Sequence, residues 1–194
     1  MIKKSLNLNA KLFAKDVEYI SPRQGFGEGL VEAGNQDKRV VVLCADVTES
    51  AHITPFAEKF GERYVEIGVA EQNMATVASG LAAVGKTPFI ASYAMFSPGR
   101  NWEQIRTTIA LNNQPVKIVG LHAGLSVEAD GATHQALEDI AIMRVIPNMQ
   151  VIVPCDTHEA KRATMAIAKT NKPTYLRLPR AKTAVITTQN TPFE

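Results

Sequence analysis

The chain has 194 residues, 45% of them hydrophobic, which suffices for one core of ordinary size and predicts a single domain with short tails. Its 21 Lys and Arg residues nearly balance its 19 Asp and Glu residues, and the formal net charge of +2 argues against binding of nucleic acid or another polyanion. No apolar run approaches membrane-spanning length, and no apolar segment follows the charged start, so we expect a cytoplasmic protein without a membrane partner.

Along the chain, short apolar runs rich in β-branched residues alternate with segments of helical periodicity. After a polar arm over residues 1–20, strands are predicted at residues 39–45, 63–67, 87–93, 116–122, 150–154 and 174–178. Helices are predicted at residues 21–34, 52–60, 69–85, 98–112, 134–146 and 156–170. This alternation is typical of right-handed βαβ units, so we expect an α/β fold: a three-layer sandwich with a mainly parallel sheet.

The predicted domain covers residues 21–180, and the Thr-rich tail over residues 181–194 is interpreted as a linker to a C-terminal domain that is absent from the chain. Pro22 should open the first helix, and Asp156 should cap the last one. The Gly-Phe-Gly-Glu-Gly run at residues 25–29 follows no strand and lacks the third glycine of a dinucleotide-binding loop. It therefore predicts close packing of a helix against a neighbouring element.

Thiol and metal chemistry have little support in the sequence. Cys44 and Cys155 lie far apart, each at the end of an apolar run, and are predicted to be reduced, buried and structural. The histidines at positions 52, 122, 134 and 158 show no metal-ligand spacing.

In a parallel sheet covered on both faces, ligands bind beyond the carboxyl ends of the strands. The segments that follow the predicted strands hold three of the four histidines and many Gly, Ser, Asp and Arg residues. These segments are residues 46–52, 68–73, 93–100, 122–134 and 177–180. Their composition predicts a site at that edge of the sheet.

Glu71 opens the helix over residues 69–85, where the helix dipole alone would favour a carboxylate. The helix behind it consists largely of Ala, Gly, Ser, Thr and Val, which suits close packing against another helix. A carboxylate in such a seam would be shielded from water and could share a proton with a ring nitrogen. For Tyr93, Phe96 and the loop over residues 122–134, composition leaves core or surface roles open beside a role in binding.

Four segments resemble the pyrimidine-binding domain of transketolases: GVAEQNM (68–74), FIASYAMFSPGR (89–100), LHAGLSVEADGATHQALED (121–139) and IPNMQVIVPCD (146–156). The resemblance runs in order over nearly the whole chain and is greatest to the carboxyl-terminal subunits of split transketolases. In these enzymes one activity is divided over two polypeptides. The resemblance implies a thiamine diphosphate-dependent enzyme of the pentose phosphate pathway that transfers a two-carbon ketol unit between sugar phosphates.

The resemblance also implies roles for individual residues. Glu71 matches the glutamate that hydrogen-bonds the aminopyrimidine ring of the cofactor, and Tyr93 and Phe96 match aromatic residues that stack on this ring. Together with Glu71, the candidates for catalysis are His122 and His134. The matches to substrate-binding positions are Arg23, Asp46, Ser50, His122, Asp130, His134, Arg177 and Arg180, where Arg177 and Arg180 are interchangeable as phosphate ligands.

One half of the family's site has no counterpart in the sequence. The diphosphate-binding domain of the family holds Mg²⁺ and the diphosphate through a Gly-Asp-Gly motif followed by an Asn, and this chain contains no Gly-Asp pair. We therefore expect no metal ligands in this chain and an amino-terminal partner subunit that holds Mg²⁺ and shares the thiamine diphosphate. Activity should require this partner, and the two subunits should self-associate in a heterotetramer.

Two other interpretations stay open. A deoxyxylulose-phosphate synthase-like subunit has similar segments, although that family typically has an aspartate where His122 stands. A non-catalytic assembly partner would retain the fold without the activity, although the candidate site residues are intact.

Overall fold

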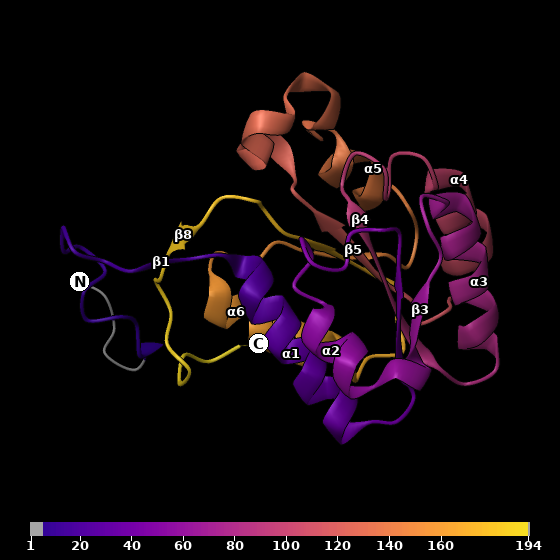
Figure 1. Cartoon of the computed structure of the whole chain (residues 1–194), viewed down its shortest axis with the longest axis horizontal. Helices are drawn as coiled ribbons and strands as arrows, with labels where there is room; N and C mark the ends of the chain where they lie inside the picture. The colour runs from indigo at the N-terminus through magenta and orange to yellow at the C-terminus, as the bar shows by residue number, and fades with distance from the viewer. Residues whose placement is uncertain (1–5, 194) are drawn as a thin grey trace.

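The computed structural model describes residues 6–193, which form a six-stranded parallel sheet between two layers of helices (Figure 1). The strands lie in the order β3-β2-β4-β5-β7-β6, and every neighbouring pair is parallel, which confirms the predicted α/β fold. Their bounds are β2 Val40–Cys44, β3 Tyr64–Glu66, β4 Thr87–Tyr93, β5 Lys117–Leu121, β6 Gln150–Ile152 and β7 Thr174–Arg177. In this described part of the chain, no helix has the length and apolar character needed to cross a bilayer.

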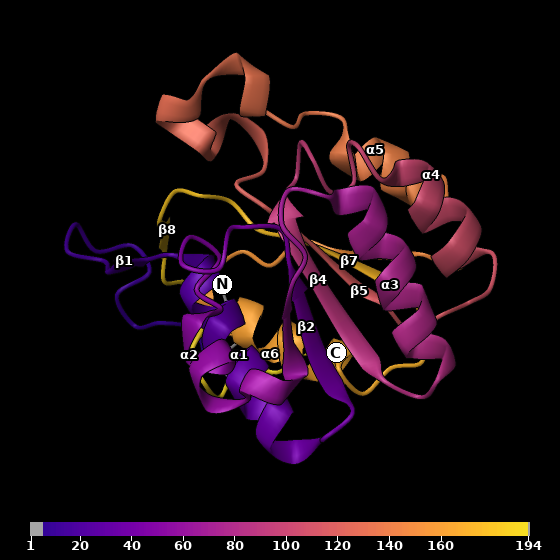
Figure 2. The same ribbon diagram turned by 45° about the vertical axis from the view of Figure 1, so that its right-hand side comes forward.

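Each face of the sheet carries its own helices (Figure 2). Because side chains alternate along β2, Val40, Val42 and Cys44 pack with one helical layer, while Val41 and Leu43 pack with the other. The first layer consists of α1 Pro22–Gln36, α2 Thr54–Lys59 and α6 Thr157–Ile167. The second consists of α3 Glu71–Ala83, α4 Trp102–Gln104, the π-helical η3 Ile105–Ala110 and α5 Asp139–Arg144. Short 3₁₀ turns are η2 Gly61–Arg63, η4 Gly124–Asp130 and η5 Ala132–His134.

Helices α1 and α6 begin and pack as the sequence predicts. Pro22 is the first residue of α1, and Asp156 caps α6 by accepting a hydrogen bond from the backbone N–H of Glu159 at 2.9 Å. A Cβ atom added at Gly25 would lie 1.8 Å from the Thr157 carbonyl oxygen, so glycine is required for α1 to approach α6 this closely. The glycine run is therefore a packing surface, as predicted.

The helix predicted over residues 98–112 begins only at Trp102. The side chain of Asn101 donates hydrogen bonds to the Glu71 carbonyl and to Ser97 Oγ, each at 3.1 Å, and thereby holds the residues before the helix in a turn. This turn depends on a partner far away in the sequence, which the local periodicity does not reveal.

Two further predictions need correction. The helix predicted over residues 134–146 begins at Asp139, because residues 132–134 form a separate 3₁₀ turn. Both cysteines are free, and Cys44 is buried as predicted, but Cys155 is exposed. Cys155 follows β6, which is an edge strand with a neighbour on one side only, so the chain leaves the sheet there without cover.

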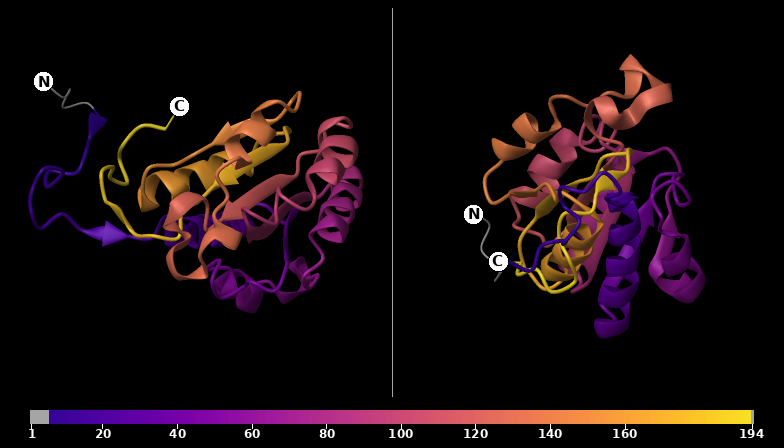
Figure 3. Two further views of the ribbon diagram at one scale, coloured as in Figure 1. Left: turned by 90° about the horizontal axis from the view of Figure 1, so that it is seen from above. Right: turned by 90° about the vertical axis from the view of Figure 1, so that its left-hand side faces the viewer.

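The polar arm and the Thr-rich tail pair with each other at one end of the molecule (Figure 3). They form a short antiparallel ladder of β1 Tyr19–Ile20 and β8 Thr183–Ala184. Beyond β8 the tail passes Asp156, whose buried carboxylate accepts hydrogen bonds from the backbone N–H groups of Ile186 at 2.8 Å and Thr187 at 2.5 Å. The N-cap of α6 therefore also anchors the tail.

Candidate functional site

Several unusual backbone conformations lie in the segments that follow the strands. Asp46, His52, Gly68 and His122 have positive φ angles of 57°, 58°, 75° and 54°. Such angles are uncommon outside glycine, and residues that adopt them concentrate at binding sites, where surrounding contacts hold them. A segment over residues 124–138 projects from the body beside this edge (Figures 1 and 2). The unusual backbone thus lies where the sequence predicts a site.

Glu71 is the first residue of α3, and its side chain is only 2% exposed. Its Oε1 atom accepts a hydrogen bond from Ser92 Oγ at 3.0 Å, and its Oε2 atom accepts one from the Arg100 guanidinium at 3.1 Å. A buried carboxylate needs such partners, since an unpaired one costs about 3–5 kcal/mol. The end of β4 and the turn after it therefore hold the Glu71 carboxylate from two sides.

The Arg100 guanidinium also lies over the Phe96 ring, with 4.1 Å between its Cζ atom and the ring centre. The Phe96 face and the Glu71 carboxylate together form a place for a flat cationic group that donates N–H bonds. Because the Arg100 side chain is 48% exposed, this place opens to solvent.

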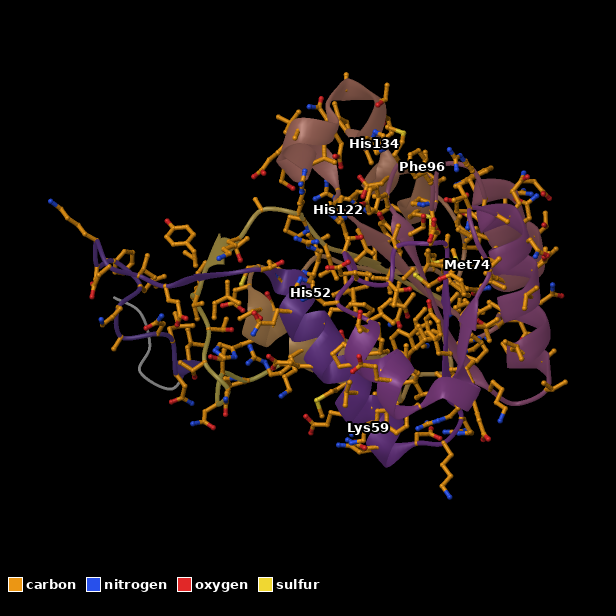
Figure 4. All side chains as sticks on the ribbon, viewed as in Figure 1. His52, Lys59, Met74, Phe96, His122 and His134 are labelled. Carbon is orange, nitrogen blue, oxygen red and sulfur yellow. The ribbon has the colours of Figure 1, made fainter. Side chains whose placement is uncertain are left out.

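Four rings form a continuous cluster that begins at Phe96. Its ring centre lies 5.1 Å from that of His134 and 6.3 Å from that of Tyr93, and Tyr93 lies 4.1 Å from His122. Figure 4 shows Phe96, His122 and His134 at the same end of the molecule. The rings thus connect the buried carboxylate to the two histidines that the sequence singles out.

His122 is buried beside two arginines. The Nη1 atom of Arg23 lies 3.3 Å from His122 Nε2 and donates to the Ser50 carbonyl at 2.5 Å, while its Nη2 atom donates to the Arg180 carbonyl at 3.0 Å. Burial, with Arg23 and Arg180 nearby, lowers the pKa of His122 to about 4, so the ring is neutral at pH 7. Burial and Arg180 also lower the pKa of Arg23. Two cations near a neutral imidazole suit an anionic ligand.

A cleft of about 580 Å³ opens beside Arg23 and Arg180, which we call the arginine cluster. The Arg180 side chain is fixed at the cleft by a hydrogen bond from Nη1 to the Val127 carbonyl at 2.6 Å and by Asp130 Oδ1 at 3.7 Å. Besides Tyr19, the ionisable side chains that line the cleft are Glu18, Arg23, His52, Glu128, Arg180 and Lys182. This mixture of acceptors and cationic donors suits a ligand that carries both hydroxyl groups and an anionic group.

The structure brings together most of the residues that the sequence singles out: Arg23, Ser50, Glu71, Tyr93, Phe96, His122, Asp130, His134 and Arg180. Arg177 is engaged by a carboxylate instead: its Nε atom donates to Asp139 Oδ2 at 2.8 Å, at the first residue of α5, and its guanidinium lies beside Gly124. Asp46 belongs to a second group of contacts, in which its backbone N–H donates to the Glu66 carboxylate at 2.8 Å.

Sequence reasoning missed several residues that hold the site in place. Ser92 and Arg100 bind the Glu71 carboxylate, Asn101 binds its backbone carbonyl, and Glu66 accepts backbone N–H groups from the loops after β2 and β3. Arg100 lies in a segment that the sequence marks as a candidate. Its partner is 29 residues away, so only the fold reveals the pairing.

The sequence raises two kinds of ligand, a flat aminopyrimidine ring and a metal ion, and the site suits them differently. A flat ring with N–H donors fits between Phe96 and Glu71, where the Arg100 guanidinium now lies. Within residues 6–193, no group of three or more His, Cys, Asp or Glu side chains is placed to hold a metal ion.

Known proteins resemble the chain over most of its length. Residues 18–185 match the family model described as the transketolase pyrimidine binding domain. A protein of Methanocaldococcus jannaschii that carries the name of a transketolase C-terminal section is 48% identical over 168 residues, which are 87% of this chain and 53% of that protein. A 1-deoxy-D-xylulose-5-phosphate synthase of Cupriavidus metallidurans is 38% identical over 166 residues, which are 86% of this chain and 26% of that enzyme.

Among solved structures, a split-gene transketolase described as an inactive β4 tetramer matches with a TM-score of 0.81 and 40% identity. The match covers 90% of this chain and 56% of that one. The chain thus spans about half the length of the Methanocaldococcus protein and of the split-gene structure. Because the family model matches 168 consecutive residues of 194, the chain belongs to the family of transketolase pyrimidine-binding domains.

Proposed function

We propose that the chain is the carboxyl-terminal, pyrimidine-binding subunit of a thiamine diphosphate-dependent transketolase. It acts with an amino-terminal partner subunit to transfer a two-carbon ketol unit from a ketose phosphate to an aldose phosphate. Two comparisons support the division into subunits, because one relative is named as a section of a transketolase and one structure as a split-gene transketolase. The proposed setting is the pentose phosphate pathway of the cytoplasm.

The observation that carries the proposal is the pairing of a buried carboxylate with an aromatic face. Glu71 and Phe96 hold a flat, N–H-donating group between them, at present the guanidinium of Arg100. An aminopyrimidine ring is equally flat and donates an N–H bond when its ring nitrogen is protonated, so Glu71 would share a proton with that nitrogen and Phe96 would stack on the ring. Thiamine diphosphate supplies the carbon–carbon chemistry when bound, while these residues orient its ring.

The phosphate of the sugar is proposed to bind at the arginine cluster. Arg23, Arg180 and His122 would donate to its oxygens, and we assign this role to Arg180 rather than to Arg177. Two contacts support the choice: the Arg180 carbonyl binds Arg23, and the Arg177 guanidinium is already paired with a carboxylate of α5.

The remaining predicted residues would contact the rest of the sugar. Asp130 and His134 lie on the projecting segment, between the arginine cluster and Phe96, and would bind hydroxyl groups near the reacting carbons. Ser50 borders the same cluster through its carbonyl, and Asp46 is proposed to act nearer the boundary with the partner subunit.

The partner is proposed to hold Mg²⁺ and the diphosphate. The sequence of this chain has no Gly-Asp pair, whereas the family's diphosphate site uses one. Both subunits would then be needed for a complete site, in a heterotetramer of two copies of each.

Ketol transfer should appear when the purified chain is mixed with the diphosphate-binding subunit from the same organism, thiamine diphosphate, Mg²⁺, a ketose phosphate and an aldose phosphate. Glu71→Ala should lower kcat at least about 100-fold, because the ring nitrogen loses the carboxyl group with which it shares a proton. Glu62→Ala, at an exposed position in η2, is the matched control and should leave kcat unchanged. If the wild-type mixture shows no ketol transfer although the partner is folded, a non-catalytic assembly role is favoured instead.

One alternative has a specific observation behind it, the similarity to a 1-deoxy-D-xylulose-5-phosphate synthase. The same mixture should be assayed with pyruvate and glyceraldehyde phosphate. A pyruvate-dependent product would replace the transketolase proposal with a synthase function.

A further inference from the structure

Arg100 makes two contacts that are unusual for a half-exposed arginine. Its guanidinium donates to the buried Glu71 carboxylate at 3.1 Å and covers the Phe96 ring at 4.1 Å. The side chain is 48% exposed, whereas that of Glu71 is 2% exposed. The arginine therefore covers the Glu71 carboxylate, and its departure would open a pocket between that carboxylate and the Phe96 ring.

A guanidinium and an aminopyrimidine ring share the features that this pocket recognises. Both are flat, both stack on an aromatic face, and both donate an N–H bond to a carboxylate, the pyrimidine when its ring nitrogen is protonated. One Glu71 oxygen and one Phe96 face offer these contacts to a single group at a time. The two groups therefore compete for the same place.

We propose that Arg100 is a built-in occupant of the pyrimidine site, which the cofactor must displace before it binds. This inference rests on the proposed function and concerns the state of the site before the cofactor arrives. Among residues 6–193, the buried carboxylate would otherwise have only Ser92 as a side-chain hydrogen-bond partner, and Arg100 provides the second. It thus keeps the empty site folded and makes the apparent affinity for the cofactor lower than the intrinsic one.

The surroundings of Arg100 allow its side chain to leave while its backbone stays. The next residue, Asn101, is fully buried and is tied to the Glu71 carbonyl and to Ser97 Oγ at 3.1 Å each. Among the described residues, the guanidinium contacts the Glu71 carboxylate and the Phe96 ring. Because Glu71 is buried, the guanidinium can leave at small cost only when the incoming ring takes over its hydrogen bond to the carboxylate. The displaced side chain would then lie free at the rim of the pocket.

The first test uses the chain alone and methylguanidinium as the probe. Arg100→Ala opens the pocket, so millimolar methylguanidinium should bind it and raise the melting temperature by about 2 °C or more. Trp102, the only tryptophan, lies two residues away and should report binding by fluorescence. The wild type and Arg106→Ala, an exposed arginine of η3, should show neither effect. The inference is overturned if methylguanidinium changes neither the melting temperature nor the fluorescence of Arg100→Ala.

The second test measures thiamine diphosphate binding by the chain with its diphosphate-binding partner. Arg100→Ala should lower the apparent Kd about three- to tenfold, and methylguanidinium should reverse this gain by competing with the cofactor. Arg100→Gln, which keeps a neutral donor for Glu71, provides a variant that should fold normally and should also bind more tightly. Weaker binding by both variants would make Arg100 a cofactor ligand and overturn the inference.

The two proposals fail in different ways. If the wild-type complex binds no thiamine diphosphate, the proposed function fails, and the first test alone decides whether Arg100 fills the pocket. If the wild-type complex binds the cofactor and the Arg100 variants bind it more weakly, the proposed function stands and the role of Arg100 as an occupant is wrong.

Discussion

The Nη1 atom of Arg23 lies 3.3 Å from Nε2 of His122, and this contact determines which ring nitrogen carries the proton. A guanidinium has only donors, so Nε2 must accept and Nδ1 must carry the hydrogen of the neutral ring. The buried Nδ1 atom has no hydrogen-bond partner among residues 6–193. His122 is therefore neutral at pH 7 and keeps a buried Nδ1–H group, which a ligand oxygen could reach only if the side chains around it move.

The low pKa of His122 should be visible in the pH dependence of stability. Its pKa of about 4 in the folded chain lies below the ordinary value of 6.5, so between these pH values the unfolded chain binds more protons. The free energy of unfolding should therefore fall as the pH decreases from about 6.5 to about 4. His122→Gln should remove about 1–3 kcal/mol of this loss, measured by urea denaturation across the range. An NMR titration midpoint of the His122 ring near pH 6.5 would contradict the prediction.

Two glycine-to-alanine substitutions should change stability in opposite directions. At Gly25 the added Cβ atom would lie 1.8 Å from the Thr157 carbonyl oxygen, so Gly25→Ala must separate α1 from α6 and cost about 2–4 kcal/mol. At Gly80, within α3, nothing lies within 4 Å of the added atom, so Gly80→Ala should stabilise the chain by about 0.5–1 kcal/mol. Urea denaturation of both variants tests the pair. A Gly25→Ala variant as stable as the wild type would mean that the two helices are not in close contact.

The sequence predicts those parts of the fold that depend on local signals. The apolar runs at β2 and, after Lys117, at β5 are continuous because both strands are buried on both faces, and such runs are visible without a structure. The cap at Asp156 and the glycine run of α1 are equally local. The exposure of Cys155 does not follow from a local signal, because no neighbouring residue in the sequence reveals that β6 lies at the edge of the sheet.

In the candidate site, too, the sequence does not reveal which residues the fold brings together. Arg177 and Arg180 are three residues apart and have the same chemistry, so the sequence leaves them interchangeable. The pleat of β7 turns Arg177 to the face of Tyr175, where both bind Asp139, whereas Arg180 lies beyond the strand at the cleft. The pairing of Arg100 with its carboxylate likewise joins two segments that only the fold brings together.

Asp156 should contribute more to stability than an ordinary N-cap. Burial would raise the pKa of its carboxyl, but hydrogen bonds from Thr187, Glu159 and Ile186 outweigh this and lower the pKa. Asp156→Ala should cost about 2–4 kcal/mol, because it removes the cap of α6 and the anchor of the tail together. Limited proteolysis should then cut the tail after β8 faster than in the wild type. Asp16→Ala, at an exposed carboxylate, is the control and should change stability by less than about 0.5 kcal/mol.

Cys155 should react slowly although it is exposed. Partial burial of its sulfur, its hydrogen bond with Glu159 and the nearby charges of Asp156 and Glu159 raise the pKa of the Cys155 thiol to about 12. The thiolate is the reactive form, so alkylation by iodoacetamide at about pH 8 should be at least tenfold slower than for a cysteine of ordinary pKa, roughly 8.5. Mass spectrometry of the alkylated chain measures the rate.

A matched pair of variants separates the electrostatic cause from simple shielding. Glu159→Gln removes the neighbouring charge and should speed the alkylation of Cys155, because the thiol then ionises at a lower pH. Glu103→Gln removes an exposed carboxylate from α4, in the opposite helical layer, and should leave the rate unchanged. Equal rates for the wild type and Glu159→Gln would show that access to the sulfur, rather than the charge of Glu159, limits the reaction.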